Sequence, residues 1–411
     1  MKGTYYFGII LVLLLFSLAP PALAQAPAPV TVVLDDVPLA FDTEPVIQEG
    51  RVLVPFRGLG EALGVEVGWD AVTRTVLARG FGKDVSLPIG EGHALVNGTP
   101  VALDAPPVIE EGRTLVPLRF FSETFGADVS WDGETRRVIV ESPPARMYTM
   151  GFYAIRSFDQ RHLLPRFDAV AFGWARVTGT GEVILDGPDY KWPQPAGEIT
   201  PERILAETGA AGTTRYLMVF AGDGQGELSR LLQDQDGMAR AGAQIAALAR
   251  EKNFDGVLID FEGLGLTDTG PELEAVRERF TGFLAVLAAN LRDYGARIAV
   301  ALPPLNSEFK GYDYGSISRY ADEIVIMAYD YKYERGPEPV GKVKEAIEEA
   351  LARVPAEKLV LGISTWSETG DSIGAKIGLA KRYGLKGISL WRLGLITGGQ
   401  WEELQRRVIM R

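Results

Sequence analysis

The distribution of hydrophobic and polar residues divides the chain into two regions with different patterns. In residues 30–142, short alternating segments are separated by glycine-containing turns, and Trp69-Asp70 recurs as Trp131-Asp132, 62 positions later. From residue 147 onward, short apolar segments instead alternate with longer segments whose apolar positions recur at helical spacing. The first pattern predicts a domain of two repeats, and the second predicts an array of strands and helices.

Each repeat is predicted to hold a β-hairpin, a short helix and a second hairpin. In the first repeat, Gly50 supplies a turn, residues 56–63 form the helix, and residues 65–77 form two strands around Asp70. Two such units can bury faces against each other that one alone could not. Charged and aromatic positions common to both units are Arg51/Arg113, Arg57/Arg119 and Trp69/Trp131. They are either ligand contacts or residues repeated because the fold is repeated.

The second region has the pattern of a (β/α)8 barrel. Strands are expected at 148–153, 169–174, 216–220, 256–261, 298–302, 323–328, 359–363 and 387–390. Helices are expected at 239–251, 271–292, 343–352 and 373–383, with another that begins at Thr200-Pro201. Eight strands within residues 147–411 predict a TIM-type α/β barrel, linked to the N-terminal α+β domain by residues 143–146. An open doubly wound sheet is the alternative, although no glycine-rich phosphate loop follows the first strand.

Composition narrows the classes of function. The chain has 42 Lys and Arg against 54 Asp and Glu, a net charge of −12, which argues against a nucleic-acid partner. It contains no cysteine, so a disulfide framework, a thiol nucleophile and a lipoprotein anchor are excluded. With His93 and His162 as its two histidines, neither a histidine-rich zinc site nor a Ser-His-Asp triad is expected. We expect no metal and no cofactor.

The first residues have the pattern of a signal peptide. Lys2 precedes an apolar run over 7–18, and Ala22-Leu23-Ala24 forms an A-x-A cleavage signature. Residues 1–24 are therefore predicted to be removed before Gln25. The alternative is an uncleaved membrane anchor. We expect a secreted, extracellular protein without a membrane span, and leave its association with the cell wall open.

The fourth predicted strand of the barrel carries the candidate chemistry. Because residues two apart share a face, Leu258, Asp260 and Glu262 are expected to project into the barrel, with Glu262 nearest the C-terminal mouth. Active sites of such barrels lie at that mouth. Two interior acids are unfavourable unless they are paired or functional, and this strand has no Lys or Arg to pair with them. A structural ion pair is the alternative.

Residues 255–262 resemble the D-x-x-D-x-D-x-E signature of family 18 glycoside hydrolases. Asp255, Asp260 and Glu262 occupy its first, third and fourth acidic positions, and Leu258 replaces the second. A leucine there makes the inner layer apolar and removes a proton-sharing partner from Asp260, which puts the rate of turnover in question.

Later segments agree with this resemblance. Met327-Ala328-Tyr329-Asp330 matches the family's M-x-Y-D, and Trp391 ends the eighth strand, where the family has an aromatic floor. Residues 336–340 and 361–363 are similar to the spore-wall and peptidoglycan-directed branch. Only a short loop separates Trp366 from the next helix, whereas many chitinases insert a small domain there, so an open groove is expected.

The resemblance implies a role for each candidate residue. Glu262 would be the catalytic acid, Asp260 would orient the N-acetyl group, and Tyr329 would hydrogen-bond the acetamide oxygen during substrate-assisted attack. The residues implied or expected to bind substrate are Asp255, Met327, Asp330, Trp391, Trp366 and Trp174. For Trp174 and Trp366 a place in the core is an equal alternative.

The two-repeat region resembles the N-terminal-like domain of copper amine oxidases over residues 30–142. That module carries no copper site and is either a spacer or a wall- or glycan-binding module. Taken together, the chain is expected to be a secreted glycosidase of N-acetylglucosamine polymers, with peptidoglycan favoured and chitin-like oligomers second. The repeats would allow association with the cell wall. A non-catalytic glycan-binding barrel and a structural wall protein are the alternatives.

Overall fold

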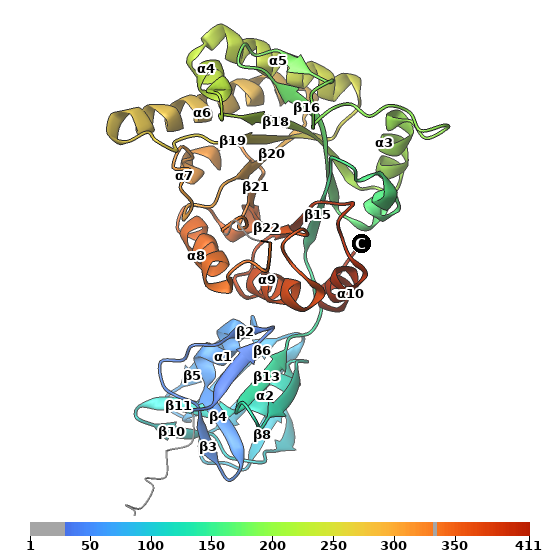
Figure 1. Cartoon of the computed structure of the whole chain (residues 1–411). Coiled ribbons are helices and arrows are strands. Elements are labelled where there is room, and N and C mark those ends of the chain that lie inside the picture. The colour runs from blue at the N-terminus through green and yellow to red at the C-terminus, as the bar shows by residue number, and fades with distance from the viewer. Residues whose placement is uncertain (1–28, 332–334) are drawn as a thin grey trace, which may run out of the picture.

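The computed structural model describes residues 29–331 and 335–411, so the predicted signal peptide lies outside the described residues. A ring of strands surrounded by helices forms the larger domain, and a smaller β-rich domain from the N-terminal part of the chain lies beside it (Figure 1). Within the described ranges, no helix is both long and apolar enough to cross a membrane. The predicted fold class, a TIM-type barrel preceded by an α+β domain, is confirmed.

Eight parallel strands form the closed barrel. They are β15 (Tyr148–Tyr153), β16 (Ala169–Val177), β18 (Thr214–Gly222), β19 (Gly256–Glu262), β20 (Arg297–Leu302), β21 (Glu323–Ile326), β22 (Leu359–Ser364) and β23 (Gly387–Trp391). β15 pairs with both β16 and β23, which closes the ring. A short strand, β17 (Val183–Ile184), extends the end of β16 in the antiparallel direction. All eight predicted strands are therefore present.

Helices alternate with these strands on the outside of the barrel (Figure 1). They are α3 (Pro201–Ala210), α4 (Glu227–Gln233), α5 (Gln235–Glu251), α6 (Gly270–Leu291), α7 (Tyr314–Ile317), α8 (Val340–Leu351), α9 (Gly370–Arg382) and α10 (Gly398–Arg407). Short 3-10 helices are η1 (Phe158–Arg166), η2 (Arg292–Tyr294) and η3 (Ala356–Lys358). The Thr200 side chain accepts the N–H of Arg203, so the predicted N-cap begins α3 as expected.

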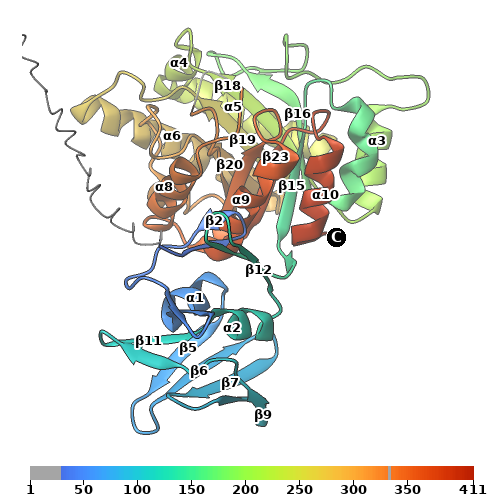
Figure 2. The same ribbon diagram turned by 60° about the horizontal axis from the view of Figure 1, so that its bottom comes forward.

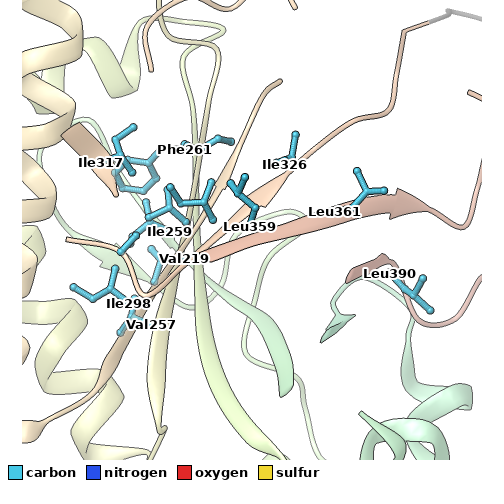
Figure 3. Packing of buried hydrophobic residues seen from close by; sticks show 14 of the residues in the cluster. Val219, Val257, Ile259, Phe261, Ile298, Ile317, Ile326, Leu359, Leu361 and Leu390 are labelled. Carbon is cyan, nitrogen blue, oxygen red and sulfur yellow. The ribbon is translucent and has the colours of Figure 1, made fainter. Parts of the chain in front are cut away.

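The alternation along the strands creates two apolar layers. Val257, Ile259 and Phe261 point outward and pack between the strands and the helices, where Figure 3 shows them among other buried aliphatic side chains. Leu258 points inward, in register with Met218 and Ala299 of the neighbouring strands. Since each strand buries both faces, the strands appear in the sequence as nearly continuous apolar runs.

The N-terminal domain is built from two equivalent halves. Its first half contains β1 (Thr31–Leu34), β2 (Val37–Pro38), β3 (Val46–Gln48), β4 (Arg51–Pro55), α1 (Phe56–Ala62), β5 (Glu66–Asp70), β6 (Thr75–Gly80) and β7 (Lys83–Pro88). The second contains β8 (His93–Val96), β9 (Thr99–Ala102), β10 (Val108–Glu110), β11 (Arg113–Pro117), α2 (Leu118–Thr124), β12 (Asp128–Asp132) and β13 (Arg137–Glu141). β4 and β11 pair antiparallel with Val54 opposite Val116. These two valines are equivalent positions of the repeat, so a local two-fold axis passes between them.

Buried charged groups join the two domains. Asp35 accepts hydrogen bonds from the backbone N–H and hydroxyl of Ser142 and from Arg407 Nη1 of α10, at 2.9, 2.6 and 3.1 Å. Lys381 of α9 donates to the carbonyl of Pro143 at 2.9 Å. The side chains of Asp35 and Arg407 are 4% and 3% exposed. In Figure 2, β2 accordingly lies against α9.

The segment predicted as a linker, residues 143–146, is part of this contact. Ala145–Arg146 forms β14, which pairs in parallel with β24 (Val408–Ile409) at the end of the barrel domain. Arg146 also forms an ion pair with Asp168. The junction is therefore held to the barrel by backbone pairing and charge rather than left free.

Candidate active site

Strand β19 places two acidic side chains at the carboxyl end of the barrel. Asp260 stands in register with Phe220 of β18 and Ala301 of β20, one layer below Glu262, which is opposite Gly222. Asp260 is buried and Glu262 is partly buried. The inward direction of both side chains follows from the alternation of the strand, because the odd-numbered neighbours fill the outer core.

A cavity of about 520 Å³ opens above these acids. Six of the residues predicted to be catalytic or to bind substrate line it: Asp260, Glu262, Met327, Tyr329, Asp330 and Trp391. The other lining residues are Phe152, Tyr190, Gly263, Ala301, Pro303, Pro304, Ser307, Glu308, Phe309 and Tyr331. The lining thus combines carboxyl, hydroxyl and aromatic groups without a lysine or arginine. The alternative of a structural ion pair at Asp260 and Glu262 finds no cation among these lining residues.

Burial controls the protonation of the two carboxyls. It raises the pKa of Asp260 well above its usual value, and the charge of Glu262 and a hydrogen bond between the two groups add to the effect. Burial also raises the pKa of Glu262, with a further contribution from Asp330, whereas the bond to Asp260 opposes the rise. Asp260 Oδ1 has no hydrogen-bond partner among the described residues. The two groups therefore form a coupled, proton-holding pair with one open acceptor.

Tyr329 follows β21 and brings a hydroxyl group into the same cavity. Burial raises the pKa of this hydroxyl well above its usual range, and the charges of Asp260 and Glu262 raise it further. Tyr190 lines the same cavity, and the pKa of its hydroxyl is raised by the same causes. Both phenols therefore remain neutral and can donate a hydrogen bond to a ligand beside the acids.

The backbone beyond Tyr329 is held by a buried carboxylate. Glu338 accepts the backbone N–H groups of Asp330 and Tyr331, at 3.1 and 3.3 Å. Its own N–H donates to Glu368 Oε1 at 3.0 Å, and Glu368 pairs with Lys376 of α9 at 2.9 Å. Asp330 has a φ of +61°, a conformation that non-glycine residues adopt rarely. Glu338 thus fixes the unusual turn that carries two cavity residues.

Trp391 ends β23 and forms an apolar wall of the cavity. Its ring meets Phe152 edge-on, with 5.3 Å between centroids, and lies 6.4 Å from the ring of Tyr190. Tyr190 in turn stacks on Phe220 at 4.4 Å. The peptide bond between Trp391 and Arg392 is cis. Trp391 thus has two aromatic neighbours and lines the cavity, where its indole suits the apolar face of a ligand.

Asp255 does not belong to this site. It precedes β19 at the opposite end of the barrel, and its carboxylate pairs with Arg215 through Nε and Nη2 at 2.8 and 2.9 Å. Seven residues along an extended strand span about 23 Å, so Asp255 cannot reach a ligand at Glu262. Its predicted role as a substrate contact is therefore corrected to a structural ion pair.

The structure also separates two of the three predicted tryptophans from the cavity. Trp174 is 3% exposed and packs edge-on against Phe172 and Trp192. It is therefore a core residue, which was one of its two predicted roles. Trp366 is 51% exposed, and its ring carries the guanidinium of Arg335 at 4.1 Å. Trp366 lies outside the cavity lining and is neither core nor wall of this site.

Three important residues were not identified from the sequence. Phe152 lies on a predicted strand and could have been found from its position near the carboxyl end of β15. Tyr190 comes from the excursion after β17, and Glu338 from the connection between β21 and α8. No periodic pattern marks either connection, so only the folded chain brings these two residues to the site.

Comparison with known families agrees with the geometry. The sequence model of glycosyl hydrolases family 18 matches residues 149–369, and that of the copper amine oxidase N-terminal domain matches residues 33–140. The chain belongs to glycosyl hydrolase family 18. Both resemblances noted in the sequence are thereby confirmed. Over residues 29–331 and 335–411, no group of three or more His, Cys, Asp or Glu residues is arranged to hold a metal ion.

Curated relatives of this family 18 chain come from Bacillus. A Bacillus subtilis sequence described as a sporulation-specific glycosylase is 34% identical over 124 residues, 28% of each chain. The cortical fragment-lytic enzyme of Bacillus subtilis is 26% identical over 244 residues, which cover 43% of this chain and 55% of that enzyme. The chain thus spans between about a quarter and just over half of the length of these relatives.

Solved structures share the fold of the barrel. A chitinase from Chromobacterium violaceum superposes with a TM-score of 0.54 at 21% identity, covering 64% of this chain and 100% of that one. The Bacillus cereus spore cortex-lytic enzyme SleL superposes with a TM-score of 0.53 at 18% identity, covering 65% and 76%. At these identities the likeness establishes the architecture of the family 18 domain.

Proposed function

We propose that the barrel is a retaining glycoside hydrolase that cleaves β-linked N-acetylglucosamine polymers with the help of the substrate's own acetamide group. One observation carries the proposal. The buried Asp260 and the partly buried Glu262 share a hydrogen bond and have raised pKa values at the mouth of the barrel, in a cavity that Tyr329 and Trp391 also line. Family membership supports the same chemistry.

In the proposed first step, Glu262 donates its proton to the glycosidic oxygen as the bond from that oxygen to the anomeric carbon breaks. The acetamide oxygen of the same sugar attacks the anomeric carbon and gives an oxazolinium ion. Because the proton of the pair lies on Glu262 when this step begins, Asp260 is a carboxylate that accepts the acetamide N–H and balances the positive charge, and Tyr329 donates a hydrogen bond to the acetamide oxygen. Such substrate assistance is a known exception to two-carboxylate hydrolysis.

In the second step, the Glu262 carboxylate takes a proton from water as the water oxygen attacks the anomeric carbon and opens the oxazolinium ring. The product keeps the β configuration, because the anomeric carbon is inverted twice. The open acceptor Asp260 Oδ1 supports the role assigned to Asp260, since a buried acceptor without a partner is unfavourable until a ligand donor satisfies it.

We favour peptidoglycan over chitin-like oligomers as the substrate. Three curated relatives from Bacillus bear the name cortical fragment-lytic enzyme, and their matches cover 43%, 38% and 50% of this chain. Residues 365–369 alone connect β22 to α9, so no inserted domain rises beside the cavity at this point. An open cleft of this kind suits a cross-linked polymer. On its N-terminal sequence pattern, we further propose that the protein is exported to the cell wall.

A second candidate function is a glycan-binding barrel without turnover. Leu258 favours it, because the apolar residue beneath Asp260 leaves that carboxyl without the deeper acid of the family signature. Glu262 disfavours it, because a protein that only binds sugar has no need for a raised-pKa acid at the protonation point.

Incubation with purified peptidoglycan and with chitin, followed by mass analysis of the soluble fragments, tests the proposal. We expect fragments that end in a reducing N-acetylglucosamine, and the β anomer should predominate at early times by NMR. Fragments that end in reducing N-acetylmuramic acid, or the α anomer as first product, would contradict the proposed linkage or mechanism. Binding without any released fragment would favour the glycan-binding barrel.

A further inference from the structure

The two-fold symmetry of the N-terminal domain places two equivalent ion pairs between its halves, and a groove lies beside one of them. Arg51 of the first half forms an ion pair with Asp104 of the second, and the equivalent Arg113 forms one with Asp42. Each pair is about half exposed and therefore sits at the surface, where it adds little to stability. Their charged groups remain accessible to a ligand.

Beside the Arg51–Asp104 pair lies a groove of about 350 Å³. The β3–β4 hairpin of the first half forms one side, with Ile47 and Arg51, and α2 and β12 of the second half form the other, with Arg119 and Trp131. Trp131 is 44% exposed and Ile47 is 46% exposed. The groove thus leaves an aromatic ring and an aliphatic side chain exposed to water next to an ion pair.

These groups match the surface of a sugar ring. A pyranose presents an apolar C–H face, which packs on an aromatic ring, and a rim of hydroxyl and acetamide groups, which need donors and acceptors. The Arg51 guanidinium has five N–H donors, of which Nε donates to Asp104 and one on Nη1 donates to the Gly50 carbonyl, and the carboxylate offers further acceptor positions. The Trp131 ring therefore offers an apolar surface for the C–H face of a sugar, and the Arg51–Asp104 pair offers donors and acceptors for its polar groups.

The charge of the groove selects among polymers. Arg51 faces Asp104, and Arg119 lies 3.9 Å from Glu123, so each cation in the groove has an acidic neighbour. A polyanion such as a nucleic acid would find no net positive charge there. We infer that this groove binds the uncharged sugar rings of a β-linked N-acetylhexosamine chain, the class of polymer that the barrel is proposed to cleave, so the inference rests on the proposed function for the identity of its ligand.

The junction between the domains fixes the position of this groove relative to the barrel. Asp35, Arg407 and the β14–β24 pairing hold the N-terminal domain to the barrel. A glycan bound beside Trp131 is therefore held at a fixed distance from Glu262 rather than on a flexible tether. Simultaneous binding at both sites would raise the apparent affinity for a long or insoluble polymer without changing turnover of a short soluble one.

The test uses the full chain carrying Glu262→Gln, which removes hydrolysis from the measurement. Trp131→Ala is compared with Trp69→Ala, the equivalent exposed tryptophan of the first half, which lies outside this groove. Binding to insoluble chitin and to purified peptidoglycan is measured by depletion from solution, and thermal unfolding checks that each variant is folded. In parallel, Trp131→Ala in the active protein is assayed on a short soluble oligomer.

We expect Trp131→Ala to weaken polymer binding about tenfold, the scale of a lost aromatic platform, and Trp69→Ala to change it less than threefold. Turnover of the soluble oligomer should be unchanged. Equal binding by both variants and the parent, or an equal loss in both, would overturn the inference. The inference would also be overturned if sedimentation detects self-association of the parent that Trp131→Ala abolishes, since the groove would then be a contact between copies of the chain. If the parent protein does not hydrolyse the polymer but binds it in a way that depends on Trp131, the proposed function is contradicted and the glycan-binding groove is not.

Discussion

Leu258 is the residue at which the reactive strand departs from the family signature, and it lies directly beneath Asp260 in the barrel interior. Leu258→Asp would restore the missing acid and give Asp260 a proton-sharing partner. We expect this change to raise turnover or to shift the pH profile of kcat, and to lower stability by several kcal/mol because it buries a charge. An unchanged profile in a folded Leu258→Asp protein would show that this position does not limit catalysis.

The raised pKa of Asp260 makes stability depend on pH in a defined direction. The pKa of Asp260 in the folded protein lies above its value of about 3.9 in the unfolded chain. Between these two pKa values Asp260 is protonated in the folded protein and ionised in the unfolded chain, so the folded protein loses stability as the pH rises through this range. Asp260→Asn cannot ionise. The variant should therefore gain thermal stability relative to the parent at pH 8 and differ little from it near pH 3. If Asp260→Asn and the parent differ in stability by the same amount at pH 8 and at pH 3, burial does not raise the pKa of Asp260 as described.

At the scale of elements, the turn after β21 depends on Glu338. Glu338→Gln replaces one acceptor oxygen by an NH2 group, which cannot accept the N–H of Asp330 or Tyr331. We expect kcat to fall about tenfold, the equivalent of one lost hydrogen bond of about 1.4 kcal/mol, with a smaller change in KM. Burial and, after it, the charge of Glu338 raise the pKa of Asp330, so Glu338→Gln should lower that pKa and move the pH profile of kcat. Glu348→Gln on the exposed face of α8 is the control and should change neither quantity.

The strands could be predicted because each is a run of apolar residues bounded by turns, and the inward direction of Asp260 and Glu262 followed from alternation alone. The error at Asp255 arose because a motif gives spacing along the chain but not which end of the barrel a residue occupies. Glu338 and Tyr190 lie on irregular connections, whose paths are set by contacts far away in the sequence. The junction at 143–146 looked like a linker because its partner strand, β24, is more than 250 residues away.

At the scale of the whole molecule, the buried charges between the domains make them one unit. Asp35→Ala would leave Arg407 buried and without one of its carboxylate partners, although Asp36 and Glu403 remain. We expect a loss of about 3 kcal/mol in the free energy of unfolding, measured with urea.

Asp42→Ala, which breaks the exposed ion pair with Arg113, is the matched control and should cost less than about 1 kcal/mol. Equal effects of the two substitutions would mean that the buried Asp35–Arg407 pair holds the domains together no more strongly than a surface pair. In that case a fragment from Arg146 onward should fold and act alone.

Turnover of peptidoglycan by Glu262→Gln, compared with the parent and with Glu308→Gln from the same cavity, tests the central claim most directly. The amide fills the same space but cannot donate a proton to the glycosidic oxygen. The account predicts a loss of at least about two orders of magnitude in turnover for Glu262→Gln, with polymer binding retained, and a loss of less than about tenfold for Glu308→Gln. Equal turnover by Glu262→Gln and the parent would contradict the role of Glu262 as the catalytic acid.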